Sequence, residues 1–461
     1  METLQRTANR GSISTGYDID NSLKLEPDNT EYLYKTQSNG NKKTWTCSFW
    51  FKRTELNDAD FPAFISATSS SWATRISIFN NGAFWVDLGY GTSYYRNIAN
   101  ALIRDTSAWY HFVVAVDSTQ ATASDRLKAY INGNLITSWN TQNLPAQNTE
   151  FKFFDSAHDM YIGNYNNAVS FLPAGYMADM HLVEGQQLAP TSFGEFDDDS
   201  GIWKPKAYTG SYGTNGFYLD FESSGSLGAD GSGNGHTWTL NNITSADQAT
   251  DTPTNNFCTW NPLWAYPNTA TVGNGGTSSI GGAAAVWRGS KGTIGLTNGK
   301  WYWEQKANGN DTIAGWQTEN VVSVTGTNAH NVNDTIAYYE SGGYIWLRDE
   351  TSGRIDTTVS GSYVNGQIVG FALDLDSSPQ TATFYRNGSA IASNVNIDGL
   401  TGKTIFPFTS HYQQTSNANF GGYTNISDAH TNTDENGYGA FVYAPPSGYY
   451  AICTKNLAEY G

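Results

Sequence analysis

The chain is poor in cysteine. Its 461 residues include three cysteines, Cys47, Cys258 and Cys453, which lie far apart and form no Cys-x-x-Cys pair. Such scattered thiols exclude a disulfide framework and a cysteine-based metal site. The seven histidines show no spacing typical of zinc ligands, so no zinc site is expected. We expect each cysteine to lie reduced in or near a core, with a Cys258–Cys453 disulfide as the less favoured alternative.

Positive charge is also scarce. The 25 Lys and Arg residues are outnumbered by 42 Asp and Glu residues, which leaves a formal net charge of -17. Phosphate backbones are bound by clustered Lys and Arg, so we expect no nucleic-acid partner. No segment approaches the roughly 18 consecutive apolar residues of a membrane span, so no membrane insertion is expected. The N-terminal segment lacks the apolar stretch of a signal peptide, which predicts synthesis in a cytosol.

Aromatic residues, glycine and alternating hydrophobicity are abundant instead. Aromatics make up 14% of the chain, charged residues 15%, and there are 47 glycines, a composition typical of a folded, loop-rich protein. Apolar residues alternate with period two, the pattern of half-buried strands, in residues 45–53, 74–79, 83–90, 109–117, 300–306 and 344–349. Residues 96–105 fit either a short helix or a strand, and no helix longer than two turns is expected.

Two distant segments repeat one pattern. Residues 115–137 and 372–393 each place an apolar pair before an Asp, then a polar turn, an alternating strand and an Asn-Gly pair. Asn-Gly supplies the two positive φ values of a type I′ hairpin. We therefore predict an all-β chain of two antiparallel jelly-roll-type β-sandwich domains in tandem. The predicted boundaries are 1–243 for the first sandwich with an N-terminal arm, 244–257 for a connector and 258–461 for the second sandwich.

The second half carries a set of motifs in the order found in a known family. They are GKWYWEQ (299–305), IAGW (313–316), NGQIVGFALDLD (365–376), TATFYRNG (381–388), FPFTS (406–410) and NANFGG (417–422). Over roughly residues 257–461 the chain thereby resembles the SPRY family. The resemblance implies a bent antiparallel β-sandwich that binds partners through loops at one end, and it implies no enzyme.

The first half is similar to the laminin-G and concanavalin A-like jelly rolls. The resemblance rests on SLKLEPDNTEYLYK (22–35), WTCSFWFKR (45–53), WYHFVVAVD (109–117), MYIGNY (160–165) and AGYMADMHLVEGQQL (174–188). Residues 214–243 are expected to return a strand to this sandwich. The pairing of two such sandwiches resembles tail and surface proteins of phages.

Catalytic motifs are weak. Concanavalin A-like sandwiches also house glycoside hydrolases that carry Glu-apolar-Asp-apolar-apolar-Glu on one strand, which puts the carboxylates on one face. The nearest match, EFDDDS at 195–200, has Asp at the later apolar positions and Ser in place of the last Glu, so it indicates a solvated acidic loop. No Gly-x-Ser-x-Gly elbow occurs, and His111 lies in an alternating strand. We therefore expect no enzyme.

Two acidic, glycine-rich loops are calcium candidates. Residues 197–201 and 230–235 offer Asp197, Asp199 and Asp230 as oxygen ligands for a hard cation. The laminin-G resemblance implies one calcium ion at the rim of the sandwich. The alternative is a pair of turns that need only glycine and Asx chemistry, and no cofactor is required in that case.

Aromatic residues in or beside loops are the candidate ligand contacts. Exposed aromatic faces near Asn, Asp and Gln hold sugar rings in lectin-like sandwiches. The candidates are Trp72, Tyr94, Tyr95, Trp316, Tyr344 and Trp346. The alternative is that these side chains are core, as we expect for the tryptophans of the strands at 45–53 and 300–306.

These features predict a non-enzymatic phage virion protein, a tail fibre or adhesin, that displays binding sandwiches for host-surface recognition. The expected partners are other virion proteins and a host-surface glycan or receptor, with a homo-oligomer, plausibly a trimer, supplying avidity. One alternative is an architectural or capsid-decorating protein that binds only neighbouring subunits. The other is a polysaccharide-active enzyme or its accessory lectin, which a carboxylate pair on one strand face would distinguish.

Overall fold

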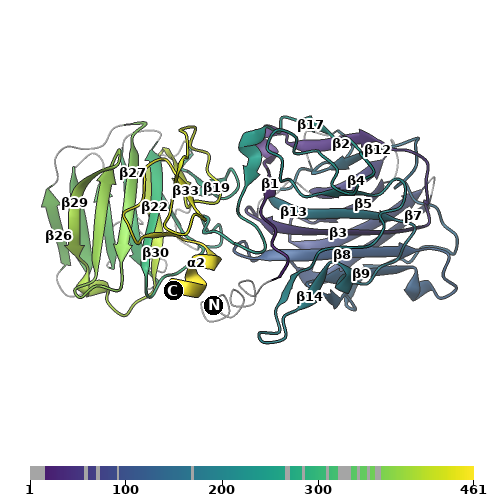
Figure 1. The fold of residues 1–461 in the computed structure, drawn as a ribbon, viewed down its shortest axis with the longest axis horizontal. Coiled ribbons are helices and arrows are strands. Elements are labelled where there is room, and N and C mark those ends of the chain that lie inside the picture. The colour runs from purple at the N-terminus through teal and green to yellow at the C-terminus, as the bar shows by residue number, and fades with distance from the viewer. Residues whose placement is uncertain are drawn as a thin grey trace. The chain divides into compact units, whose positions relative to one another are not determined.

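The computed structural model contains two compact units, Ser14–Thr254 and Asn255–Gly461 (Figure 1). The residues it describes are 16–56, 61–68, 73–90, 93–167, 171–264, 270–282, 286–307, 311–319, 334–339, 343–349, 353–358 and 365–461. No helix in these ranges combines the length and the hydrophobicity needed to span a bilayer.

The first unit is a sandwich of two antiparallel sheets. We name them after central strands. The β3 sheet has the order β10 (Asn134–Leu135), β9 (Leu127–Ile131), β8 (Trp109–Asp117), β3 (Thr44–Arg53), β13 (Gly175–Glu184), β1 (Ser22–Leu25) and β18 (Gln248–Ala249), with β16 (Phe217–Leu219) beside β13. The β6 sheet has the order β11 (Trp139–Gln142), β7 (Ser93–Leu102), β6 (Ala83–Tyr90), β5 (Ala73–Ile78), β4 (Ala63–Thr68), β12 (Asp159–Ile162), β2 (Tyr32–Thr36) and β17 (Thr239–Asn241).

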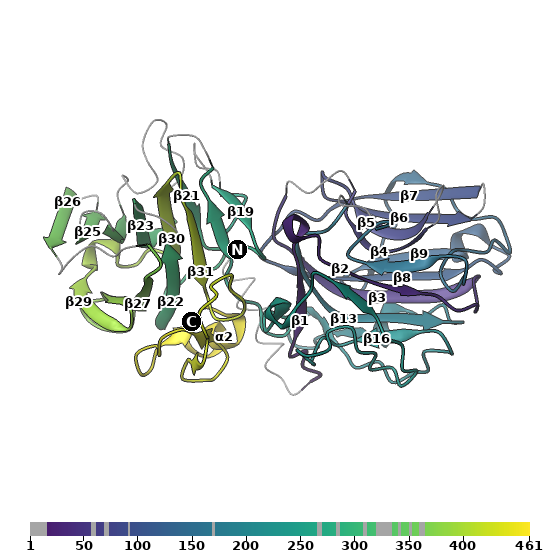
Figure 2. The same cartoon turned by 90° about the horizontal axis from the view of Figure 1, so that it is seen from above.

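In Figure 2, strands β7, β6 and β5 of one sheet lie apart from strands β8, β3 and β13 of the other. Alternation places Trp45, Cys47, Phe49 and Phe51 of β3 in the core between them. Strands β16 and β17 confirm that residues 214–243 return to this sandwich. The segment 96–105 fitted either a helix or a strand. Its residues 96–102 belong to strand β7, because their alternation continues that of residues 93–95.

The second unit is also a sandwich of two sheets. The β22 sheet has the order β19 (Thr271–Gly273), β20 (Ser278–Ile280), β31 (Thr415–Asn419), β22 (Lys300–Ala307), β27 (Ile368–Asp374), β28 (Thr381–Arg386) and β29 (Ser389–Asn396), with β34 (Tyr450–Ala451) parallel to β22. The β23 sheet has the order β21 (Trp287–Lys291), β30 (Ile405–Tyr412), β23 (Thr312–Thr318), β24 (Thr335–Tyr339), β25 (Tyr344–Asp349) and β26 (Gly353–Thr358). Trp301, Trp303 and Trp316 fill its core, and a short helix, α2 (Thr454–Tyr460), ends the chain.

Short elements complete both units. They are the hairpins β14 (Gly194–Phe196) with β15 (Trp203–Pro205) and β32 (Asn432–Thr433) with β33 (Ala440–Phe441), and the 3-10 turns Pro27–Asn29, Ala123–Asp125, Pro190–Ser192, Ser245–Asp247 and Asp398–Leu400. The predicted fold class, two antiparallel β-sandwiches in tandem, is confirmed.

The repeated pattern forms the same hairpin in each unit. Strands β8, β9 and β10 correspond to β27, β28 and β29, and an Asn-Gly turn joins the last two strands of each set. The φ values are 48° and 76° at Asn132 and Gly133, and 45° and 75° at Asn387 and Gly388. Both residues of each turn therefore have the left-handed conformation that a type I′ turn requires.

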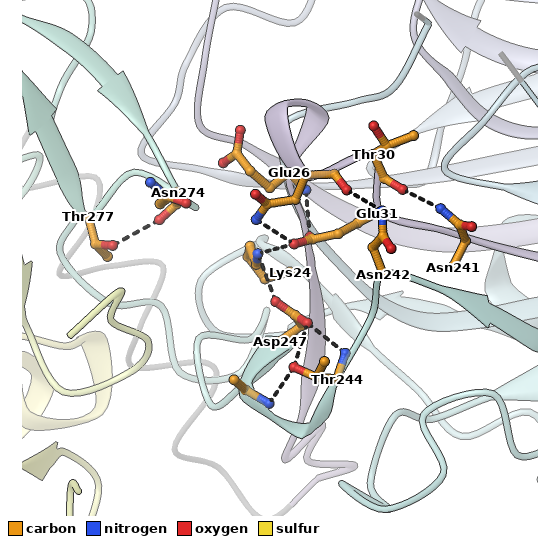
Figure 3. Close-up of polar contacts among 12 residues, drawn as sticks. Lys24, Glu26, Thr30, Glu31, Asn241, Asn242, Thr244, Asp247, Asn274 and Thr277 are labelled. Atoms are coloured by element: carbon orange, nitrogen blue, oxygen red, sulfur yellow. Dashed lines mark hydrogen bonds and ion pairs between the residues drawn. The ribbon is translucent and has the colours of Figure 1, made fainter. Parts of the chain in front are cut away.

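The segment expected as a connector, 244–257, is largely built into the first unit. Lys24 of β1 is buried and forms ion pairs with Glu31 at 2.7 Å and Asp247 at 2.8 Å (Figure 3). Thr244 and Asp247 form a capping box at the turn that follows. Further on, β18 pairs with β1, and Asp251 forms a buried ion pair with Lys52. Residues 244–251 show little period-two alternation, and buried ion pairs nevertheless hold them against the first unit.

Candidate functional site

The outer face of the β6 sheet carries a cluster of charged and aromatic side chains. Alternation along β6 turns Phe84, Val86 and Leu88 into the core. Trp85 and Asp87 therefore lie on the opposite face, away from the partner sheet. Both are nearly inaccessible to solvent, so neighbouring side chains cover this face rather than water.

Asp87 is the hub of this cluster. Its cross-strand partners are Arg75 on β5 and Arg96 on β7. Its carboxylate accepts from Arg75 Nε at 3.0 Å, Arg96 Nε at 3.2 Å, Trp85 Nε1 at 2.5 Å and Tyr94 Oη at 2.9 Å. Burial raises the pKa of Asp87, and the two guanidinium groups act in the opposite direction. Four donors thus fix one carboxylate and hold the surrounding side chains in a single arrangement.

The two guanidinium groups lie against the indole ring of Trp85. The Cζ atoms of Arg75 and Arg96 are 4.0 Å and 4.2 Å from its centroid, within the range of cation–π attraction. Arg96 also lies over the ring of Tyr94, 4.8 Å from the centroid. The Arg96 side chain remains about one-third exposed, whereas that of Arg75 is 8% exposed. Arg96 and Tyr94 are therefore the solvent-facing members of this cluster.

The cluster begins a row of aligned side chains that crosses the sheet. Because cross-strand partners share a face, the register places on one face, in order, Arg96, Asp87, Arg75, Ser66, Tyr161, Tyr34 and Thr239. We call this the cross-sheet row. At about 4.8 Å between strands, it is about 29 Å long. Tyr34 and Tyr161 stack with centroids 6.1 Å apart, so the row has an aromatic group at its second end as well.

A groove adjoins the Arg96 end of the row. It has a volume of about 370 Å³ and is lined by Phe79, Asn81, Ala83, Ile98, Ala99, Asn100, Leu102 and Asn140. Phe79 stacks on Trp85 with centroids 4.3 Å apart, and Ile98 is the cross-strand partner of Trp85. Phe79 and Ile98 of the groove are thus neighbours of Trp85 in the charged cluster. Apolar walls with a few amide groups are the usual lining of a small-ligand site.

The predicted ligand residues Tyr94 and Tyr95 of the first unit lie on opposite faces of the β6 sheet. Tyr94 lies on the outer face and belongs to the cluster described above. Tyr95 is its neighbour on β7, points the other way and packs against the core. Trp72 lies outside the described residues.

The expectation that the aromatics of the second unit lie exposed at loops is wrong for two of them. Trp316 is fully buried in the core, because it lies on β23 with its side chain toward the β22 sheet. Trp346 on β25 is 3% exposed and packs with Ile313 and Phe408 on the outer side of the β23 sheet. Tyr344 is half-buried against the same cluster. Strand alternation, not loop position, decides where these side chains point.

The calcium candidates already have other hydrogen-bond partners. Asp197 accepts from the backbone N–H groups of Asp199 and Ser200, and Lys204 Nζ lies 3.2 Å away. These donors lower the pKa of Asp197 to about 2. Asp230 accepts from backbone N–H groups of residues 218, 232 and 236. No group of three His, Cys, Asp or Glu residues that could hold a metal occurs in the described ranges. The geometry favours the alternative that these are Asx turns.

A buried serine–histidine contact has the wrong proton arrangement for nucleophilic catalysis. His111 Nε2 lies 2.8 Å from Ser48 Oγ, and Trp203 Nε1 donates to His111 Nδ1 at 2.9 Å. An indole N–H can only donate, so Nδ1 is the acceptor and the proton of the neutral ring lies on Nε2. Burial lowers the pKa of His111 to about 3. His111 therefore donates to Ser48 and does not accept its proton.

Glu304 is a buried carboxylate with a structural use. It accepts hydrogen bonds from the backbone N–H groups of Val442 and Tyr443, from Tyr302 Oη and from Asn419 Nδ2. Burial raises its pKa to about 7. Because all four partners are donors from the surrounding fold and the side chain is fully buried, Glu304 anchors the 440–443 segment instead of facing a substrate.

Apart from Tyr94, the sequence did not predict the residues that form the charged cluster. Arg75, Trp85, Asp87 and Arg96 lie within alternating strands and look like ordinary strand positions. The signal that could have found them is charge, because each of three strand segments contains a single charged residue. These are Arg75 in TRISIF (74–79), Asp87 in AFWVDLGY (83–90) and Arg96 in SYYRNIANAL (93–102).

Comparison with known proteins finds several similar structures and one similar family. Similar solved structures include the SPRY domain of human HERC1 (18% identity, 34% of this chain, 96% of that chain, TM-score 0.29) and the TRIM65 PSpry domain (15%, 35%, 87%, TM-score 0.28). Another is a heptameric SAP-like pentraxin from Limulus polyphemus (14%, 38%, 80%, TM-score 0.28). The comparison with curated protein sequences finds no match. Residues 27–186, which supply most strands of the first sandwich, are similar to the Concanavalin A-like lectin/glucanases superfamily.

Proposed function

We propose that this chain is a non-enzymatic binding protein whose first unit binds a glycan on the outer face of the β6 sheet. The observation that carries the proposal is the cross-sheet row, whose Arg96 end lies near the groove that Asn100 and Asn140 line. The similarity of residues 27–186 to the Concanavalin A-like lectin/glucanases superfamily supports a carbohydrate-binding role.

The groove suits sugar chemistry. Asn81, Asn100 and Asn140 offer side-chain amides, which both donate and accept, next to the apolar surfaces of Phe79 and Ile98. A sugar ring has hydroxyl groups at its edges and apolar C–H groups on its faces, so it fits a lining of this mixed kind. The rigid strands hold these groups in place before a ligand arrives, which lowers the entropy cost of binding.

A glycan array probed with the full chain tests this proposal. Any glycan that binds is then titrated against Asn100→Ala and Asn140→Ala. Each variant loses a hydrogen-bonding group, and we expect affinity to fall about three- to tenfold. The matched control is Asn134→Ala, an exposed asparagine on β10 of the other sheet, which should leave affinity unchanged. An array without binding, or groove variants that bind like the wild type, would contradict the proposal.

The biological setting we propose is a phage virion, as part of a tail fibre or adhesin. Support comes from the resemblance of the tandem sandwiches to phage surface proteins and from the advantage that many weak sites on one particle act together. Cryo-electron microscopy of a particle that carries this chain tests the setting. An outer face of the β6 sheet that points to solvent fits host-surface recognition, whereas one covered by other virion subunits would make the protein architectural.

A further inference from the structure

The Arg96 end of the cross-sheet row has more positive than negative charge. Arg75 and Arg96 share the single carboxylate of Asp87, and each uses its Nε atom for that bond. Neither guanidinium group has a second anionic partner among the described residues. Among the described residues, two guanidinium groups therefore share one carboxylate at this place, in a chain whose net charge is -17.

This excess charge is held in a partly desolvated setting. Trp85 lies against both guanidinium groups, Tyr94 against that of Arg96 and Tyr165 against that of Arg75, and the Arg75 side chain is almost fully covered. Electrostatic attraction to an arriving anion is stronger where water is partly excluded. The two guanidinium groups can therefore bind one further anionic group.

The exposed guanidinium of Arg96 has the geometry to receive such a group. Its Nε atom is directed at Asp87, which leaves the edge formed by its two terminal nitrogens without a carboxylate. That edge matches a carboxylate or a sulfate group with two parallel hydrogen bonds. Ile98, two residues beyond Arg96 on β7, lines the groove together with Phe79, so a sugar ring that carries the anion has a nearby surface to lie on.

We propose that the ligand is an acidic glycan, whose carboxylate or sulfate group binds the terminal nitrogens of Arg96 while the charge of Arg75 adds attraction from behind. This inference rests on the proposed glycan-binding function and specifies its ligand class. Selectivity follows from charge, because a neutral glycan leaves the excess positive charge of the cluster uncompensated.

The test is an array of neutral, carboxylated and sulfated glycans probed with the full chain at low salt. Carboxylated or sulfated glycans should bind at least tenfold more tightly than neutral ones, and the preference should weaken as salt rises from about 0.05 to 0.5 M. Comparison of uronate-bearing with sulfated glycans identifies which anion is used. Arg96→Gln should reduce affinity for the acidic ligand tenfold or more.

The control is Lys128→Gln, which removes the same charge from β9 in the other sheet, where Lys128 pairs with the exposed Asp125. It should bind like the wild type. Equal binding of neutral and acidic glycans would overturn the acidic-ligand inference and leave glycan binding standing. An acidic preference that Arg96→Gln does not reduce would place the anion elsewhere and overturn it too. No binding to any glycan would refute the proposed function itself.

Discussion

The buried ion pair between Lys52 and Asp251 allows a sharp test of how the first unit is stabilised. Lys52 Nζ lies 2.7 Å from Asp251 Oδ2, and the two side chains are 0% and 1% exposed. Trp109 Nε1 donates to the second carboxylate oxygen at 3.0 Å. Asp251 lies in the segment whose sequence predicts a connector, so its removal also tests whether that segment is part of the fold.

Replacing Asp251 by alanine should be strongly destabilising. The change leaves the buried ammonium of Lys52 without its counter-charge, and breaking a buried pair in this way costs about 3–5 kcal/mol. We therefore expect the free energy of unfolding of the first unit to fall by about 4 kcal/mol. At roughly 2–4 °C per kcal/mol for a unit of this size, its melting temperature should fall by about 8–16 °C.

Differential scanning calorimetry of the full chain measures this, since each unit has its own core and can show its own transition. The double variant Lys52→Met, Asp251→Leu removes both charges and should recover most of the loss, because well-packed apolar side chains replace a buried pair at little cost. Asp125→Ala, which breaks the exposed pair with Lys128, should cost less than about 1 kcal/mol. A loss from Asp251→Ala no larger than that from Asp125→Ala would refute the reasoning.

Three further predictions concern buried groups. Trp316→Ala should lower the free energy of unfolding of the second unit by about 3–5 kcal/mol, measured by urea unfolding, because it leaves a large cavity in that core; a loss below about 1 kcal/mol would contradict its core position. Burial raises the pKa of Glu304 from 4.5 to about 7, so its contribution to the free energy of unfolding of the second unit is fully present below about pH 4.5 and is lost as pH rises through about 7. The melting temperature of the second unit should fall across this pH range, and Glu304→Gln should make that fall smaller. The thiols of Cys47, Cys258 and Cys453 are buried and form no disulfide, and burial raises the pKa of Cys453 to about 12. Ellman's reagent should react with none of them in the native protein and with all three in urea, and rapid reaction in the native state would show that a core opens.

Much of the fold could be predicted from local pattern. Period-two alternation identified the strands of both sandwiches, because one face of each strand must be apolar where it meets the partner sheet. The Asn-Gly pairs at Asn132 and Asn387 located the repeated hairpin, because few other residue pairs tolerate two positive φ values. Local pattern did not reveal how residues 247–251 are held, because Asp247 and Asp251 form ion pairs with residues about 200 positions away.

The candidate site could be predicted far less well. Alternation shows that Tyr94 and Tyr95 point to opposite sides of β7, but it does not show which side is the core. The same limit explains Trp316, whose neighbours in sequence resemble a loop-flanked strand and whose side chain is nonetheless fully buried.

The sequence by itself determined that this protein is all-β, acidic, poor in reactive thiols and built from two related sandwiches. Those properties depend on composition, on period-two patterning and on turn residues, all of which act locally. Only the tertiary structure decided that Arg96, Asp87 and Arg75 meet on one face over Trp85, because cross-strand register brings together residues that are 9 to 21 positions apart in the chain. Register depends on how whole strands bury their apolar faces, so a short stretch of sequence does not reveal it.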